Sequence, residues 1–235
     1  MRWTGDTSGG DWLLPRLGTW GSVTSLLPRD YEAYVRVLPP EPDGGVTPQV
    51  LAALTVPLTM ATTTPEQITI GVWDGFGELH PDAGMVWVLA GLDTDAGELA
   101  KLQAAAEAEY KHEHRAALDP DVARAVERID GRPGDDLLHL PHRDYVLLEG
   151  SLDELADPLW GCGAGIGWTS TGNGPMPQLI WPADHAWCLS AEIDDDSAVI
   201  GGSAHLVAAI RATPGIEVLP VGPDDRLVRD VQRAD

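Results

Sequence analysis

The stretch from Trp181 to Val221 constrains the fold of this chain more than any other part of the sequence. It reads in order as an alternating strand, an acidic cluster, a Gly-Gly turn, a short helix and a closing strand. The residues from Trp187 to Ile193 alternate with the period of two that is typical of a strand. Ser203 is a favourable N-cap for the helix that follows. A strand, a capped helix and a strand in close succession predict helices packed against a sheet.

The rest of the chain repeats this mixture of elements. Further strands are predicted over residues 31–37, 68–73, 85–89, 145–148 and 179–181. Helices are predicted after Thr47-Pro48, over 96–118 and over 119–129, and Pro57 is expected to kink or shorten the first of them. Strands and helices are interleaved without strict alternation. We therefore predict one α+β domain over residues 1–235, with a mixed or mainly antiparallel sheet and helices packed against it.

The two periodicities also predict the core. The residues expected to be buried are Val35, Val37, Ile70, Val72, Val86, Val88, Val146, Leu148, Leu189, Ala191, Leu206 and Ile210. Hydrophobic residues make up 43% of the chain, which is an ordinary share for a globular domain and enough to form such a core.

The chain is strongly acidic, with a formal net charge of −22. Residues 1–118 hold 16 acidic and 7 basic residues, and residues 119–235 hold 21 and 8, so the charge is spread over the whole chain. Such a body repels phosphate backbones and anionic lipid surfaces, so we expect no nucleic-acid partner and no membrane partner. A basic protein partner or a cation is attracted instead, although the charge can also serve solubility alone.

Cysteine content and the beginning of the sequence favour a cytoplasmic protein. The first residues lack the apolar region of a signal peptide, and Cys162 and Cys188 are the only cysteines. Two thiols in this setting predict reduced side chains, and Cys188 is expected to be a buried small residue. Gly161 to Gly167 has a glycine at every second position, which fits neither phosphate-loop spacing, so no cofactor is expected. No pattern indicates an oligomeric state.

Two groups of side chains are candidates for chemistry. Glu192 and Asp194 share one face of the strand that begins at Trp187, and with His142 or His185 they could form an acid–base or cation site. The alternative interpretation is a solvated strand end with unrelated surface histidines. The face that carries Glu192 and Asp194 is expected to be the wetter one, because the opposite face is apolar.

The tryptophans form a second candidate group. Trp160, Trp168 and Trp181 flank a Gly/Trp-rich segment at about 159–178, which has no periodicity and is predicted to be a long loop. Tryptophans on loops are typical of binding surfaces, so these three are candidates to line an open cleft. The alternative is that they fold back and fill the interior of the domain.

Three segments resemble a widespread actinobacterial family of cytosolic proteins to which no activity is assigned. They are Trp73-Asp74-Gly75-Phe76-Gly77, Pro141-His142-Arg143-Asp144-Tyr145-Val146-Leu147 and Trp181-Pro182-Ala183-Asp184-His185-Ala186-Trp187-Cys188. Leu27-Pro28-Arg29-Asp30-Tyr31 resembles a motif of the SUKH superfamily of immunity and scaffold proteins, whose acidic α+β domains suit this composition. In that superfamily the motif opens a helix, whereas the residues after Tyr31 alternate like a strand. Neither resemblance implies particular functional residues.

Two functional hypotheses follow. The first is a non-enzymatic, acidic, cytoplasmic module that binds another protein, and an immunity-like protein is one form of it. This hypothesis follows from the absence of a recognisable pattern of catalytic residues in the sequence. The second is a small enzyme or divalent-cation-binding protein that uses Glu192 and Asp194 with His142 or His185. A concave pocket shared by carboxylates and a histidine would favour the second hypothesis.

Overall fold

The computed structural model describes residues 1–38, 46–77, 79–80, 136–141, 143–169, 172, 174–191 and 197–227, with single positions between 97 and 127. The strands are β1 (Arg2–Thr4), β2 (Ala33–Leu38), β3 (Ile68–Trp73), β4 (Leu137–Leu140), β5 (Arg143–Gly150), β6 (Leu179–Pro182), β7 (Cys188–Ala191), β8 (Ala198–Gly202) and β9 (Glu217–Val221). The helices are α1 (Pro48–Met60), α4 (Leu152–Leu155), α5 (Trp160–Ala164) and α6 (Ala204–Arg211), with short 3-10 turns at Ser8–Gly10, Leu14–Arg16 and Val23–Ser25.

The strands form one nine-stranded antiparallel sheet in the order β1-β5-β3-β6-β7-β8-β2-β9, with β4 beside β5. β4 pairs with the first half of β5 and β1 with the second half, so both lie along the same edge of that strand. This arrangement confirms the predicted α+β fold with helices packed on a mainly antiparallel sheet.

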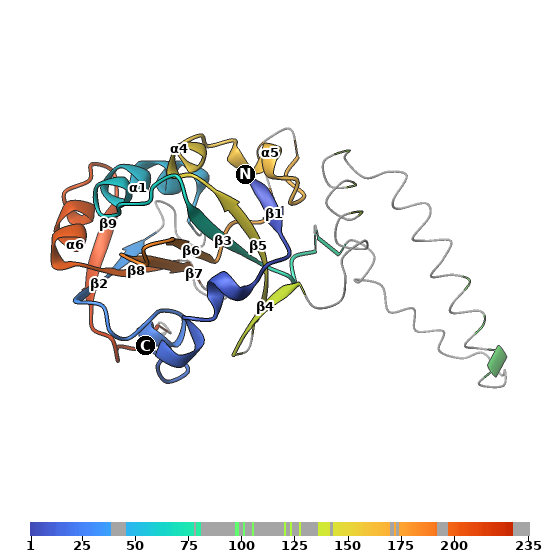
Figure 1. The fold of residues 1–235 in the computed structure, drawn as a ribbon, viewed down its shortest axis with the longest axis horizontal. Helices are drawn as coiled ribbons and strands as arrows, with labels where there is room; N and C mark the ends of the chain where they lie inside the picture. The colour runs from blue at the N-terminus through green and yellow to red at the C-terminus, as the bar shows by residue number, and fades with distance from the viewer. Residues whose placement is uncertain are drawn as a thin grey trace, which may run out of the picture.

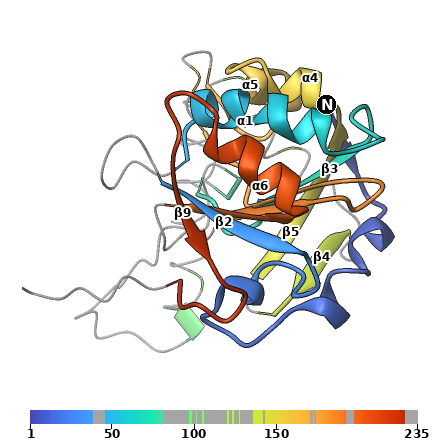
Figure 2. The same cartoon turned by 90° about the vertical axis from the view of Figure 1, so that its left-hand side faces the viewer.

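The sheet is covered on both faces (Figures 1 and 2). The helices lie on one face, where Leu54 of α1 and Ile210 of α6 pack with Ile70 of β3 in the larger core cluster. The N-terminal arm lies on the other face, where Leu13 and Leu27 pack against Leu147, Leu179 and Val199 in a second cluster. Nine of the ten predicted core residues that the structure describes are buried, while Ala191 is half-buried and Val86 and Val88 lie outside the described residues.

Two helices begin where their caps predict. The Thr47 hydroxyl accepts a hydrogen bond from the backbone N–H of Val50 at 3.3 Å, and the Ser203 hydroxyl accepts one from Leu206 at 3.1 Å. Each hydroxyl satisfies a backbone donor that has no partner within its helix. Pro57 does not shorten α1, which continues to Met60. A proline this close to the end of a helix removes only one of its last hydrogen bonds.

Several sequence-based expectations differ from the structure. The segment 159–178 is not a continuous loop, because it contains α5, which ends at Gly165 in the left-handed region with a φ of 66°. Gly201 and Gly202 do not form a turn but lie within β8. The strand predicted at 85–89 lies outside the described residues, and only single positions of the helices predicted at 96–118 and 119–129 are described.

Candidate functional site

The three candidate tryptophans are buried and do not line an open cleft. Trp160, Trp168 and Trp181 are 5%, 1% and 1% exposed. The rings of Trp160 and Trp168 pack with their centroids 5.0 Å apart, and the Trp168 indole N–H donates to the Pro175 carbonyl at 2.7 Å. A Cβ atom at Gly161 would lie 2.1 Å from the Trp168 ring. The glycine of this segment therefore allows an indole to pack against the backbone, and the tryptophans fill the interior.

Trp12 of the N-terminal arm packs against both Trp181 and His185. The imidazole of His185 stacks on the Trp12 indole with ring centroids 3.9 Å apart and planes 11° apart, and Trp12 meets Trp181 edge-on at 6.3 Å. His185 has a φ of 54°, and its carbonyl accepts a hydrogen bond from the Tyr31 hydroxyl at 3.1 Å. Burial, assisted by the nearby Arg16 guanidinium, lowers the pKa of His185. Through these contacts, His185 holds the N-terminal arm against the sheet.

The other three candidates, His142, Glu192 and Asp194, lie outside the described residues. The part of β7 that precedes Glu192 shows that the expected wet face is buried, because Cys188 and Ser190 are 0% and 2% exposed. The physical reason is the N-terminal arm, which covers that face with apolar side chains. Burial also raises the pKa of the Cys188 thiol, in agreement with its predicted role as a small buried residue.

A polar pocket lies where β3 ends and β5 begins. This Trp73 pocket has a volume of about 440 Å³ and is lined by Trp73, Asp74, Gly75, Leu140, Arg143 and Asp144. The backbone N–H of Asp74 donates to the Asp144 carbonyl at 2.9 Å, which continues the β3–β5 ladder by one residue. Asp74 and Asp144 thus lie across from each other at the end of the sheet. Like charges in that position repel each other.

A histidine lies beside each of these two carboxylates. His139 lies opposite Asp144 in the β4–β5 register, and its Nδ1 atom is 2.7 Å from the carboxylate. The Nε2 atom of His80 is 3.3 Å from a carboxylate oxygen of Asp74. The backbone N–H of His80 donates to the Phe76 and Gly77 carbonyls, which holds the imidazole in the turn after β3. The result is a row of imidazole, carboxylate, carboxylate and imidazole. No group of three or more metal-binding side chains occurs among the described residues.

Arg143 and Trp73 form the remaining wall of the pocket. The Arg143 guanidinium lies over the Trp73 indole at 5.6 Å from the ring centroid. The indole folds back over the turn, because a Cβ atom at position 75 would lie 2.2 Å from the ring and only glycine leaves the space. Gln178 accepts a hydrogen bond from the Trp73 backbone N–H at 2.8 Å, and Phe76 meets the indole edge-on. Trp73 is therefore held from several sides.

A larger, open hollow lies at the opposite end of the β3–β5 pair. This Glu66 hollow has a volume of about 710 Å³. The residues that line it are Met1, Arg2, Glu66, Gln67, Ile68, Thr69, Glu149, Gly150, Ser151, Glu154 and Ala183. Glu149 forms an ion pair with Arg2, whose side chain is 80% exposed. Three glutamates thus surround the hollow, and the Arg2 pair is open to solvent.

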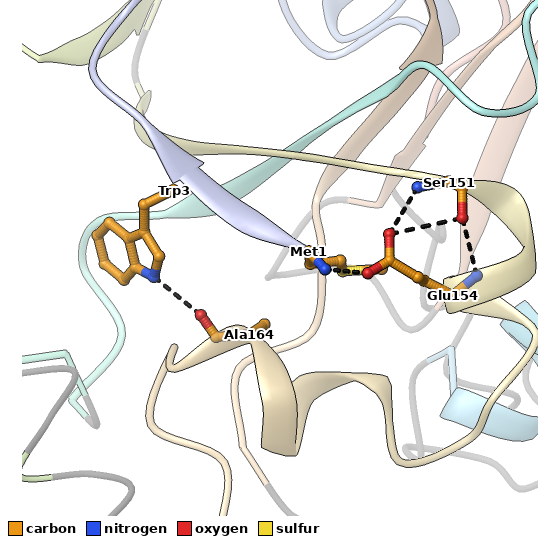
Figure 3. A network of polar contacts seen from close by, with 5 residues as sticks. All are labelled: Met1, Trp3, Ser151, Glu154 and Ala164. Atoms are coloured by element: carbon orange, nitrogen blue, oxygen red, sulfur yellow. Dashed lines mark hydrogen bonds and ion pairs between the residues drawn. The ribbon is translucent and has the colours of Figure 1, made fainter.

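Glu154 connects this hollow to the start of α4 (Figure 3). Its carboxylate accepts a hydrogen bond from the Ser151 backbone N–H at 2.9 Å, and the Ser151 hydroxyl accepts one from the Glu154 N–H at 3.2 Å. The Met1 amino group also donates to this carboxylate. Burial would raise the pKa of Glu154, but these hydrogen bonds outweigh it and lower the pKa. The Trp3 indole N–H donates to the Ala164 carbonyl at 2.9 Å and fixes β1 beside α5.

The Trp73 pocket was not predicted from the sequence. Two of the three segments that carry the actinobacterial resemblance, residues 73–77 and 141–147, meet there. His139 and Asp144 are brought together by a hairpin in which only two residues separate β4 from β5. Two strand-like runs with a two-residue connection are the signal that could have revealed this hairpin.

The chain matches no protein-family model, no curated protein and no solved structure. No helix among the described residues has the length and apolar character that a membrane crossing requires.

Proposed function

We propose that this protein is a non-enzymatic binding module for a basic protein partner. The observation that carries the proposal is the Glu66 hollow, an open concavity on a chain with a net charge of −22. It is lined by three glutamates, of which Glu149 pairs with Arg2 and Glu154 with the Met1 amino group, while Glu66 is exposed. An acidic concavity on an acidic body attracts lysine and arginine side chains over a distance and accelerates encounter with a basic surface.

The charges around the hollow are accessible to such a partner. Glu66 is exposed, and the Glu149 side chain is 42% exposed in its pair with Arg2. An exposed ion pair contributes little to stability, about 0–1 kcal/mol, so a partner's cation can replace Arg2 at small cost. Gln67 and Thr69 supply polar groups beside the carboxylates. The hollow thus suits a cationic side chain with hydrogen-bond donors.

The resemblance to the SUKH superfamily implies one particular kind of binding module, and the proposal includes it. This kind is an immunity-like protein that binds a basic protein in the cytoplasm. The structure of the motif itself differs from that superfamily, since Tyr31 is followed closely by β2 and not by a helix. The acidic binding surface supports the immunity-like role, and the order of elements at the motif does not.

The rival function, a small enzyme or divalent-cation-binding protein, rests on Glu192 and Asp194 with His142 or His185. Of these, the structure describes only His185, which packs against Trp12. A rise in melting temperature with divalent cations that disappears in a Glu192→Gln variant would favour this rival.

The experiment that tests the proposal is capture from the native host's lysate on the immobilised protein. We expect a basic protein to be retained at low salt and released as the salt shortens the range of electrostatic attraction, between about 0.05 and 0.5 M. The purified partner should then bind the protein in solution with the same dependence on salt. A partner without excess positive charge, binding that does not change with salt, or no retained protein would each contradict the proposal.

A further inference from the structure

The Glu66 hollow already holds a cation that belongs to the chain itself. Arg2 of β1, Glu149 of β5 and Thr69 of β3 are direct neighbours in the sheet, because Arg2 pairs with Glu149 and Glu149 pairs with Thr69. Side chains of residues that lie directly opposite each other share one face of an antiparallel sheet. The three side chains therefore form a row that lines the hollow, in which the Arg2 guanidinium forms an ion pair with the Glu149 carboxylate.

The other side of Glu149 carries no charge in this row. Thr69 is half-buried, and the next residue in the same row is Trp181, which is 1% exposed and belongs to the second core cluster. Among the described residues, Arg2 is the only ion-pair partner of Glu149. A second guanidinium that binds both oxygens of the Glu149 carboxylate therefore has to displace Arg2.

The side chain of Arg2 can leave Glu149 while its strand stays in place. This side chain is 80% exposed, so water can replace the contact of its guanidinium with the carboxylate. β1 itself is held by its ladder with β5 and by the Trp3 indole N–H, which donates to the Ala164 carbonyl at 2.9 Å (Figure 3). Exposed side chains change rotamer within picoseconds to nanoseconds. Displacement of Arg2 therefore requires only the rotation of a side chain.

We propose that an arginine side chain of the basic partner takes the place of Arg2 on Glu149, so that Arg2 weakens binding at the hollow by competing with the partner. This role rests on the proposed function of the hollow, because Arg2 has no competitor without a basic partner. The partner group is an arginine because the resident group is a guanidinium, whose paired donors match the two oxygens of a carboxylate. An exposed ion pair of ordinary strength lowers the affinity of a competitor by about two- to five-fold.

The test uses a single arginine, acetylated at its amino end and methylamidated at its carboxyl end, so that the guanidinium is its only charge. An NMR titration at low salt follows the backbone amide signals of Thr69 and Glu149, which report binding at the hollow. We expect Arg2→Gln to bind this probe about two- to five-fold more tightly than the original chain. The matching lysine probe should bind Arg2→Gln at least about two-fold more weakly than the arginine probe.

Two further variants separate competition for Glu149 from a general effect of charge. Arg211→Gln removes an exposed positive charge from the last turn of α6 and changes the net charge by the same amount as Arg2→Gln. It should leave the affinity for the arginine probe unchanged. In a chain that carries Glu149→Gln, the addition of Arg2→Gln should bring no gain in affinity, because the carboxylate for which Arg2 competes is absent.

Thermal melts first establish that the variants fold, and the outcomes then separate the role of Arg2 from the function of the hollow. The same gain in Arg211→Gln, a gain that persists without Glu149, or equal binding of the lysine probe would each overturn the role of Arg2. Equal affinity of the original chain and Arg2→Gln would also overturn it but leaves the proposed function in place, because the hollow then accepts a cation beside Arg2. The absence of a saturable shift in every folded chain would contradict both.

Discussion

His185 illustrates how a single residue with apparent catalytic potential can serve the fold. Its imidazole stacks on Trp12, and the arm that carries Trp12 also brings Arg16 close to the ring. Burial and this positive charge oppose protonation more strongly than Asp184 favours it, so the pKa of His185 lies below its usual value of 6.5.

We expect the NMR titration of His185 to show this shift directly. Its ring protons, assigned with a His185→Gln variant, should titrate with a midpoint below 6.5, and Arg16→Gln should move the midpoint upward. A midpoint at or above the usual value would mean that the arm does not pack on this ring in solution.

Trp187 tests the core at the residue scale. Its side chain is fully buried, and its indole N–H donates to the Leu58 carbonyl at 3.1 Å, which joins the residue just before β7 to α1. Trp187→Ala should lower the free energy of unfolding by about 3–5 kcal/mol in denaturant melts. Trp20, which is 53% exposed, is the control, and Trp20→Ala should cost no more than about 1 kcal/mol. Similar losses at the two positions would contradict the assigned packing.

At the scale of elements, Asp184 joins two loops that are far apart in sequence. Its carboxylate accepts hydrogen bonds from the Thr62 hydroxyl at 2.8 Å, and from the Thr63 N–H and hydroxyl at 2.6 and 2.8 Å. Burial alone would raise the pKa of Asp184, but these hydrogen bonds, with one from the Ala186 N–H, lower it. The loop after α1 and the loop after β6 are thereby fixed to each other.

Removing this charge should reduce stability in a way that depends on pH. The contribution of a carboxylate with a lowered folded pKa is fully present above the unfolded pKa and is lost as the pH falls through the folded value. Asp184→Asn should therefore lower the free energy of unfolding at pH 7 by about 1 kcal/mol, and this difference should shrink in acid. Urea melts at pH 7 and in acid measure this difference in the free energy of unfolding. Asp224→Asn, in an exposed turn, is the control. A difference that grows in acid would show that the carboxylate does not make these bonds.

Elements with strong local signals were predictable from the sequence. β3 was predicted at its observed bounds, and the caps Thr47 and Ser203 located α1 and α6, because alternation and capping depend only on near neighbours. β1 and β4 were missed, because each is too short to show a period and is held in place by its pairing with β5. The Trp73 pocket was missed for the same reason, since its two aspartates are 70 positions apart and meet only through strand pairing.

The face assignments show a second limit of local patterns. Alternation placed Leu189 on the apolar face of its strand, and the structure confirms that Leu189 is buried, in the core cluster that the helices cover. It could not reveal that an arm of irregular structure covers the opposite face, because Leu13 and Leu27 belong to segments without a period. A polar or small residue such as Ser190 then lies in the interior although the sequence predicts a wet position.

At the scale of the whole molecule, the net charge disfavours a nucleic-acid partner. We expect no measurable binding to duplex DNA or RNA near physiological salt, because almost all affinity for a phosphate backbone comes from lysine and arginine. The chain has only 15 lysine and arginine residues and 37 acidic residues. An electrophoretic mobility-shift assay checks this expectation. Micromolar binding that weakens with salt would contradict it.

The central claim is that the Glu66 hollow binds a basic protein partner, and the most direct measurement is a charge-matched comparison of three baits. Glu66→Lys/Glu149→Lys reverses two charges in the hollow, and Glu217→Lys/Asp224→Lys reverses two exposed charges on and after β9, so both variants have the same net charge. Thermal melts first establish that both variants fold. Quantitative mass spectrometry then measures the basic host proteins that each bait retains. The original chain and the β9 variant should retain them, and the hollow variant should retain at least about ten-fold less. This loss is expected because like charges replace complementary ones at the interface. Equal capture by all three baits, or equal loss on both variants, would show that the hollow is not the binding surface.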